Sequence, residues 1–405
     1  MLRSPANRRL VRAINRSMVL NVVRESGPIS KAEIARSTGL SQATVGAIVP
    51  SLIEHGLVSE SDPTVTGIGR PATQLQLDRD SYNVVGLKLM EDRIVGAVTD
   101  LEARTLGQSE LPVAELEPAS IVEAAAEVVD DLLQISGLRR ERLLGVGIGM
   151  AGVIDTNRGL CRNSPFLGWR NVPIGELAEA RLEVPVRVDN DVNTLALAER
   201  WFGVGQQADD FLLITLGRGV GLSIVAGGNV YRGAQGGAGE FGHTVVAESD
   251  ELCSCGNRGC LEATVGEPAL LRRAQELCIA RDLSSPATAA ELYAAAIRDQ
   301  ELANLLVRAG EHLGRGISNL INLFAPALVI LSGEGVVAGE TLLGAVQTEL
   351  DVRVHKGLQD SYELMVEPLR DEAWARGAAS LILDAVFEPP TRSRSVPLWE
   401  WDSPP

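Results

Sequence analysis

The sequence predicts a mixed α/β protein in which a small N-terminal module precedes a larger body of two related lobes. Strand-like apolar runs alternate with helical patterns over residues 81–387, which is typical of buried sheets covered by helices. Tandem strands at 84–98 and again at 211–225 each lead into a helical unit, and this repetition indicates two lobes built alike. Residues 1–80 instead carry three helical patterns in close succession.

The composition is that of a globular protein. Of the 405 residues, 45% are hydrophobic and 22% are charged, which excludes collagen-like, coiled-coil and wholly disordered chains. No run of 18 apolar residues occurs, so the sequence excludes a membrane span. The basic N-terminus lacks the apolar stretch of a secretory signal, because Asn21 and Arg24 interrupt it. We therefore expect a cytoplasmic protein without a membrane partner.

Charge is distributed unevenly along the chain. The net charge of −16 would by itself argue against a nucleic-acid partner. Residues 1–80, however, hold ten basic and seven acidic residues, whereas residues 81–405 hold 27 basic and 46 acidic residues. This asymmetry weakly indicates a small polyanion-binding module attached to an acidic body.

Apolar spacing and a cap mark the first two helices of the N-terminal module. Residues 11–24 form an amphipathic pattern whose apolar face is expected at Val11, Ile14, Met18 and Val22. Ser30 and Glu33 form a capping box for a second helix. Gly39 is expected to end that helix, because glycine readily takes the left-handed conformation of a tight turn.

A third helix is expected from Ser41. Its first polar residues, Ser41, Gln42 and Thr44, are placed to contact base edges in a major groove. Two strands after it would form a wing with Arg70 at its tip, where a guanidinium can enter an A·T-rich minor groove. This order of features predicts a winged helix-turn-helix that binds DNA, and a helical protein–protein module is the alternative.

The body is expected to hold seven strands and five long helices. The strands are expected at 84–89, 94–98, 144–148, 184–188, 211–216, 222–225 and 328–331. The helices are expected at 119–135, 192–202, 265–280, 301–323 and 371–386. We divide the chain into a DNA-binding domain (1–80), a first lobe (81–189 plus 372–387), a second lobe (190–371) and a disordered tail (388–405).

Polar residues at strand ends suggest a ligand site in the body. Glycines at 147–152 follow a strand and let the backbone approach a ligand, although a tight turn alone explains them equally well. Asn190 and Asp191 also follow a strand, at the position where ligands of α/β sheets gather. They could hold vicinal hydroxyl groups, with Asp191 as a general base, or Asp189 or Asn190 could simply cap the next helix.

Two glycine-rich stretches, 215–221 and 231–243, form the next candidate site. A strand, a glycine turn and a second strand can cradle phosphate, but this arrangement is also an ordinary hairpin. Glu240 and His243 are polar groups set among glycines, which favours a ligand site.

Three of the five cysteines lie within eight residues. Cys253, Cys255 and Cys260 together with His243 make a complete tetrahedral set for Zn²⁺. Such a cluster in a large chain without a secretory signal indicates a metal site rather than a disulfide framework. Because four protein ligands leave no open position, the zinc would be structural; a chance cluster of buried thiols is the alternative.

At this point the chain resembles the ROK family of repressors, open reading frames and sugar kinases, over about residues 10–387. The resemblance rests on Asn190-Asp191-x-Asn193, on the stretch 239–243 and on the cysteine motif that ends in Leu261-Glu262. It implies an actin-like (ribonuclease H-like) body with a sugar in the cleft between the lobes. It further implies that the sugar is contacted by Asn190, Asp191, Glu240, His243 and Glu262, and that Asp191 corresponds to the catalytic base of the kinases.

The sequence departs from the kinases where they hold ATP. The kinases open with Asp-x-Gly-Gly-Thr, but here Lys88 replaces the Asp, and Met90 and Glu91 replace the glycines. The second phosphate motif reads Gly217-Arg218-Gly219, and the adenosine-side glycine pair reads Leu331-Ser332-Gly333-Glu334-Gly335. Side chains would fill the space that the phosphates need, and carboxylates would repel them. We therefore expect that the protein has no catalytic residue and is not an enzyme.

The sequence therefore predicts a sugar-responsive transcriptional regulator whose partners are operator DNA and a sugar or sugar phosphate. A repressor that binds as a homodimer or homotetramer to a palindromic operator fits the symmetry of such proteins. The first alternative is an ATP-dependent sugar kinase fused to a DNA-binding domain. The second is a regulator that binds DNA constitutively and has lost its ligand.

Overall fold

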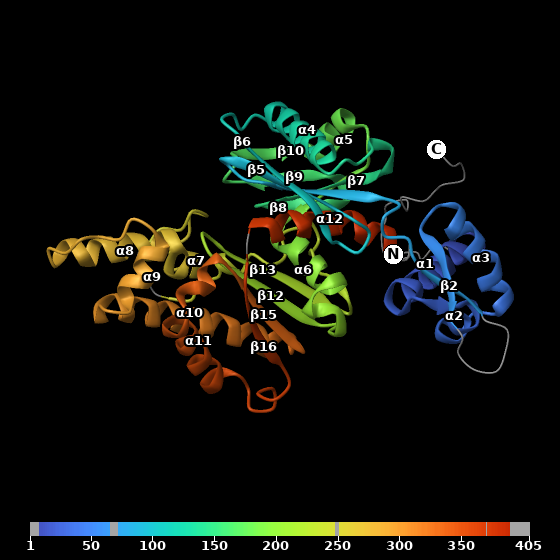
Figure 1. Ribbon diagram of the computed structural model, residues 1–405. Coiled ribbons are helices and arrows are strands. Elements are labelled where there is room, and N and C mark those ends of the chain that lie inside the picture. The colour runs from blue at the N-terminus through green and yellow to red at the C-terminus, as the bar shows by residue number, and fades with distance from the viewer. Residues whose placement is uncertain (1–7, 65–71, 248–250, 370, 389–405) are drawn as a thin grey trace. The chain divides into compact units, whose positions relative to one another are not determined.

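The computed structural model describes residues 8–64, 72–247, 251–369 and 371–388 (Figure 1). Arg70 and nearly all of the expected tail lie outside these residues. The described part of the chain has no helix that is both long enough and apolar enough to cross a membrane. It separates into two compact units: unit 1 contains the residues up to Asp189 and those from Ala375 onward, and unit 2 contains Asn190–Trp374.

The N-terminal module has three helices and a small antiparallel sheet of order β1-β3-β2. Its elements are α1 (Arg8–Ser26), β1 (Ile29–Ser30), α2 (Lys31–Thr38), α3 (Gln42–Glu54), β2 (Val58–Thr64) and β3 (Ala72–Leu77). The predicted capping box is present, since Glu33 N–H donates to the Ser30 hydroxyl and Glu33 accepts from Ser30 N–H. Gly39 ends α2 with a φ of 71°. These features confirm the winged helix-turn-helix arrangement.

The predicted inner face of α1 is wrong. Val11 is 44% exposed, whereas Val19, Leu20 and Val23 are buried. The helix carries more apolar residues than one stripe requires, so two overlapping stripes satisfy the helical period. Packing against α2, α3 and β3 selects the stripe that contains Leu20, and local spacing alone does not distinguish the two.

Unit 1 contains a five-stranded sheet of order β11-β7-β4-β5-β6. Its strands are β4 (Asn83–Leu89), β5 (Arg93–Thr99), β6 (Thr105–Pro112), β7 (Leu143–Met150) and β11 (Val186–Asn190). Its helices are α4 (Pro118–Ile135), η1 (Arg140–Arg142), η2 (Thr156–Arg158), α5 (Ile174–Leu182) and, from Ala375 onward, α12 (Asp371–Phe387). A smaller sheet has strands β8 (Val153–Asp155), β9 (Leu160–Ser164) and β10 (Trp169–Val172).

Unit 2 contains a second five-stranded sheet, of order β14-β13-β12-β15-β16. Its strands are β12 (Phe211–Leu216), β13 (Val220–Ala226), β14 (Asn229–Val230), β15 (Leu328–Gly333) and β16 (Glu363–Pro368). Its helices are α6 (Asp191–Phe202), η3 (Val204–Gln207), η4 (Phe241–His243), α7 (Leu261–Val265), α8 (Glu267–Ala280), α9 (Ala289–Ala296), α10 (Gln300–Phe324), η5 (Glu334–Ala338) and α11 (Glu340–Arg353). The predicted helix 265–280 starts later than expected, because Gly266 separates α7 from α8.

The two sheets share one topology, which confirms that the body consists of two related α/β lobes. In each sheet the first three strands form an antiparallel meander, and the fourth pairs in parallel with the first. The fifth strand lies beyond the fourth in both. The parallel crossovers carry helices, as buried sheets of this kind require.

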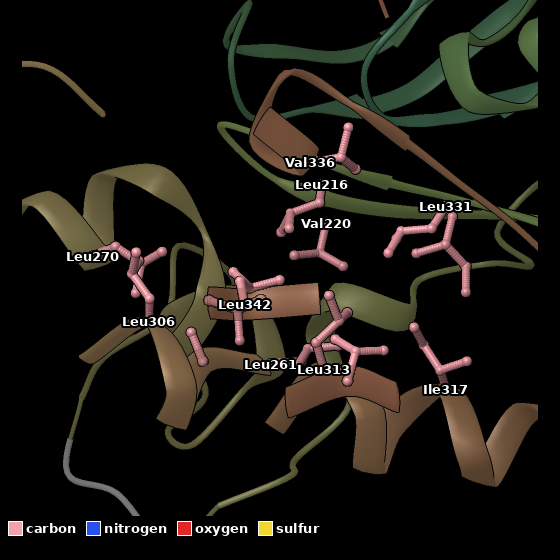
Figure 2. Packing of buried hydrophobic residues seen from close by; sticks show 14 of the residues in the cluster. Leu216, Val220, Leu261, Leu270, Leu306, Leu313, Ile317, Leu331, Val336 and Leu342 are labelled. Atoms are coloured by element: carbon pink, nitrogen blue, oxygen red, sulfur yellow. The ribbon is translucent and has the colours of Figure 1, made fainter. Parts of the chain in front are cut away.

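The core of unit 2 lies beneath the β12–β13 turn. Leu216 ends β12 and Val220 starts β13, and both are buried together with Leu261 of α7 and Leu313 of α10. Figure 2 shows these labelled side chains in the interior of unit 2, between the strand ends and the helices. The core therefore fixes the glycine turn 217–219 and the start of α7 relative to each other.

Candidate functional site

The predicted DNA-reading residues lie at the start of α3. Ser41 is the N-cap residue, and its hydroxyl accepts a hydrogen bond from Thr44 N–H at 3.1 Å. The hydroxyls of Ser41 and Thr44 are 2.8 Å apart, so the cap engages both. Ser41 and Gln42 are exposed and Thr44 is half-buried. Gln42 is therefore the long polar side chain of this group that the cap does not use. The helix itself continues through Pro50 to Glu54.

Asn190 and Asp191 lie at the N-terminus of α6, in unit 2. The side-chain oxygen of Asn190 accepts hydrogen bonds from Val192 N–H at 2.9 Å and Asn193 N–H at 3.4 Å, so Asn190 does cap the helix. Asp191 is only 7% exposed, and its Oδ1 accepts from Val192 N–H at 3.0 Å. The side chain of Asp191 therefore lies at the positive, N-terminal end of the α6 dipole.

Asn193 of the same motif has a structural role. Its side-chain oxygen accepts a hydrogen bond from the buried hydroxyl of Ser223 at 2.8 Å, which attaches the first turn of α6 to β13. A Cβ on Gly221 would lie 2.5 Å from Val192 Cγ2, so the helix start and this strand are in close contact. The motif thus places Asp191 by packing as well as by hydrogen bonding.

The thiols of Cys253, Cys255 and Cys260 and the imidazole of His243 converge in unit 2. One ligand atom from each lies within 4.8 Å of the other three. Gly256 and Gly259 have φ angles of 91° and 72°, which lets the loop turn twice in a few residues. The cysteine-rich loop and η4 are joined by main-chain pairing of Val245 with Cys260. The four residues can hold a metal ion.

His243 connects the metal cluster to Glu240, one of the residues predicted to bind the sugar. Its Nδ1 lies 3.4 Å from Cys253 Sγ, and its Nε2 lies 3.8 Å from Glu240 Oε2. The two ring nitrogens therefore face opposite neighbours. A metal held through Nδ1 would fix the imidazole and, through it, the position of Glu240.

Glu262 is held by two hydrogen bonds between the metal cluster and the glycine turn. Its Oε1 accepts from the Ser254 hydroxyl at 3.2 Å, and its Oε2 accepts from Val220 N–H at 3.3 Å. A Cβ on Gly219 would lie 2.9 Å from the same Oε2, so glycine leaves room for this carboxylate. The Glu262 carboxylate is therefore in direct contact with the β12–β13 turn.

The carboxylates of this group influence one another. Burial raises the pKa of Glu240; His243 lowers it, and the negative charges of Glu262 and Asp191 raise it further. Glu240 is therefore close enough to His243, Glu262 and Asp191 to be influenced by their charges, and we refer to these four side chains as the polar cluster. Such a cluster suits a ligand with several hydroxyl groups.

Side chains lie at the positions that the predicted resemblance assigns to the phosphate motifs. In unit 2, a Cβ on Gly217 would lie 2.5 Å from Glu334 Oε2, so this carboxylate covers the turn. Trp374 Nε1 donates to the other oxygen of Glu334 at 3.3 Å. In unit 1, Lys88 is 8% exposed within β4.

Sequence reasoning missed the polar group around Glu334. Glu267 accepts a hydrogen bond from the Tyr293 hydroxyl at 3.1 Å, and burial raises the pKa of Glu267, which the tyrosine hydrogen bond lowers and nearby Glu334 raises. Its N–H donates to Gly217 O at 2.9 Å. Glu267, Tyr293 and Glu334 come from three separate stretches of sequence, and of these three only Glu334 belongs to a motif that the sequence indicated. No local spacing could have brought them together.

The fold and the site together define a class: an actin-like α/β body of the sugar-kinase type that carries a winged helix-turn-helix module. Residues 84–385 match the ROK family, and residues 12–59 match a winged helix-turn-helix DNA-binding family. The chain belongs to the ROK family. The predicted family is confirmed.

Two named relatives are similar along nearly their whole length. The xylose repressor of Caldicellulosiruptor bescii is 28% identical over 397 residues, covering 95% of this chain and 99% of the relative. The transcriptional dual regulator NagC of Escherichia coli K12 is 28% identical over 383 residues, covering 93% and 94%.

Solved structures of a ROK regulator and of ROK kinases are similar to the structure of this chain. A ROK family transcriptional regulator described as a homologue of the E. coli MLC protein has a TM-score of 0.85 at 24% identity, covering 95% of this chain and 98% of the other. A ROK family glucokinase from Streptomyces griseus, in complex with glucose and AMPPNP, has a TM-score of 0.65 at 29% identity, covering 74% and 98%. The match to the kinase thus leaves about a quarter of this chain uncovered.

Proposed function

We propose that this protein is a transcriptional repressor whose affinity for operator DNA is set by a sugar bound in unit 2. The observation that carries the proposal is the polar cluster of Asp191, Glu240, His243 and Glu262 in a chain that also holds a winged helix-turn-helix. Two relatives that are similar over nearly their whole length, a xylose repressor and the transcriptional regulator NagC, support the same function.

In this proposal the sugar is bound by acceptors and donors that the fold holds in place. Asp191, Glu240 and Glu262 accept hydrogen bonds from hydroxyl groups, and His243 presents the Nε2 edge of its ring to the same ligand. The Asn190 oxygen is engaged in the cap, so its amide nitrogen is the atom that would donate to a sugar hydroxyl. Asp191 binds the sugar here without acting as a base.

We further infer that the metal cluster holds Zn²⁺. Two thiolates at about 2.3 Å from zinc and at tetrahedral angles are about 3.8 Å apart; Cys255 Sγ and Cys260 Sγ are 3.7 Å apart. A thiolate and an imidazole nitrogen in the same geometry are about 3.6 Å apart, and His243 Nδ1 and Cys253 Sγ are 3.4 Å apart. Bound zinc would crosslink η4 to the cysteine loop and so hold Glu240 and Glu262.

On the DNA side, Gln42 is proposed to read a base, and Ser41 and Thr44 to contact base edges or phosphate. Arg70 is proposed to enter a minor groove, although it lies outside the described residues. A homodimer or homotetramer would present two such modules to a palindromic operator.

An ATP-dependent sugar kinase remains the competing function, because a ROK glucokinase shares the body fold. Two observations argue against it. By the resemblance to the kinases, Lys88 stands in place of the Asp of the first phosphate motif, and the Glu334 carboxylate lies against Gly217, where it would repel a phosphate. We therefore propose that the protein does not transfer phosphate.

One experiment tests the proposed function directly. The purified protein is used to select bound sequences from a random DNA pool, and affinity for the selected duplex is then measured with and without D-xylose, N-acetylglucosamine and its 6-phosphate. A sugar-dependent change in affinity that Asp191→Asn abolishes is expected. The proposal is wrong if no sugar alters DNA affinity, and the kinase becomes the better explanation if the protein consumes ATP in the presence of a hexose.

A further inference from the structure

Helix α12 begins in one unit and ends in the other. It runs from Asp371 to Phe387, and the boundary between the units lies between Trp374 and Ala375. The chain also passes between the units at Asp189 and Asn190, directly before the Asp191 carboxylate. One crossing between the units is therefore next to Asp191, and the other is next to Trp374, which contacts Glu334.

The first turn of α12 is connected to the ligand cluster through the glycine turn of unit 2. Trp374 Nε1 donates to Glu334 Oε1 at 3.3 Å, and the other oxygen of Glu334 lies against Gly217. Gly219, two residues further on, lies against the Glu262 carboxylate. A shift of Glu262 on ligand binding would therefore move the turn that Glu334 contacts, and with it the acceptor of the Trp374 hydrogen bond.

The middle of α12 packs on the centre of the unit 1 sheet without intervening side chains. A Cβ on Gly86 of β4 would overlap the carbonyl oxygen of Ala375, and a Cβ on Gly147 of β7 would overlap that of Ala378. Both alanines are fully buried. Backbone contact of this kind leaves little room for the helix to bend, so it moves as one piece with the sheet.

The last residue of α12 contacts the first helix of the DNA-binding module. Asn21 Nδ2 of α1 donates to the carbonyl oxygen of Phe387 at 2.9 Å. The Arg24 guanidinium lies over the Phe387 ring, 5.2 Å from its centre. Phe387 is fully buried. A cation at a helix C-terminus and over an aromatic face is favourable on both counts.

From these contacts we propose that α12 couples the ligand cluster of unit 2 to the winged helix-turn-helix. The proposal rests on the proposed function, because it requires a ligand in unit 2 and DNA at the module. Ligand binding changes the Glu262–Gly219 contact, Glu334 and Trp374 convey that change to the start of α12, and Phe387 conveys it to α1. Reciprocity requires that operator DNA change the sugar affinity by the same factor.

Two variants at opposite ends of the helix test the coupling. Trp374→Phe keeps an aromatic ring but removes the N–H that Glu334 accepts. Asn21→Asp replaces the donor with a carboxylate that repels the Phe387 carbonyl. Asn15→Asp is the matched control, since it makes the same change of charge on the same helix, six residues away. Thermal unfolding shows that each variant is folded.

The measurement is the ratio of operator Kd values with and without saturating sugar, the probes being D-xylose and N-acetylglucosamine. A wild-type ratio in the usual allosteric range of about 5–150 is expected. Trp374→Phe and Asn21→Asp should each reduce it at least about threefold, with sugar affinity measured by calorimetry unchanged and Asn15→Asp behaving as wild type.

The outcomes separate the two proposals. If the wild-type protein responds to sugar and both variants respond equally well, α12 does not couple the sites, while the repressor function stands. If the wild-type protein binds DNA but no probe changes its affinity, the proposed function and the coupling are both wrong. If Asn21→Asp loses DNA binding altogether, Trp374→Phe alone decides.

Discussion

A single methyl group placed between α10 and α11 tests whether the packing of unit 2 is as close as described. Gly314 lies on the face of α10 that contacts α11. A Cβ there would be 2.7 Å from Glu349 Cβ and 2.8 Å from the carbonyl oxygen of Val346. Carbon atoms in contact are about 3.5–4.0 Å apart, so α11 would have to move away by roughly 1 Å.

The expected cost of Gly314→Ala follows from this overlap. Overpacking costs about 1–3 kcal/mol, and the upper end applies because the main-chain oxygen of Val346 cannot rotate away. Alanine regains up to about 1 kcal/mol of helix propensity. The net loss should be about 2 kcal/mol, which lowers the Tm of a domain this size by about 4–8 °C.

Gly344→Ala on α11 is the matched control. A Cβ at Gly344 meets nothing within 4 Å, and the residue lies in a helix without a positive φ. The same exchange should therefore stabilise the protein by about 0.5–1 kcal/mol. Thermal unfolding followed by circular dichroism measures both. If Gly314→Ala melts at or above the wild-type temperature, the α10–α11 contact is looser than the structure shows.

Three further variants test the proposed sites. Cys255→Ser should reduce the metal content from about one zinc per chain to none and weaken sugar binding, because Glu240 and Glu262 lose their support; elemental analysis that finds no zinc in wild-type protein contradicts this. Asp191→Asn should cost about 1.5–3 kcal/mol of sugar affinity by calorimetry while operator binding is kept. Gln42→Ala should relax base preference more than it lowers non-specific DNA binding, as measured by competition between selected and random duplexes.

Local signals in the sequence predicted local structure well. The capping box of Ser30 and Glu33 and the glycine that ends α2 depend on neighbours only a few residues apart, and all three are in place. The strands that pair as β4–β5 and β12–β13 are long, apolar and separated by short turns, so their pattern is unambiguous.

Features that depend on distant partners could not be predicted. The inner face of α1 is chosen by α2, α3 and β3, not by the period of its own residues. Helix α11 went undetected because its buried residues Leu342, Val346 and Leu350 are few and set among polar ones. The contact of Trp374 with Glu334 joins residues 40 positions apart, for which the sequence holds no signal.

Because unit 1 is built from two separate stretches of the chain, the units must fold in a definite order during synthesis. Unit 2 is one uninterrupted stretch, Asn190–Trp374, and can fold as soon as that stretch has left the ribosome. Unit 1 lacks the helix that covers Gly86 and Gly147 until the residues from Ala375 to Phe387 have been made. Helix α1 therefore cannot form its contact with Phe387 until α12 has been made. The DNA-binding module is attached to the body only after synthesis of unit 2 is complete.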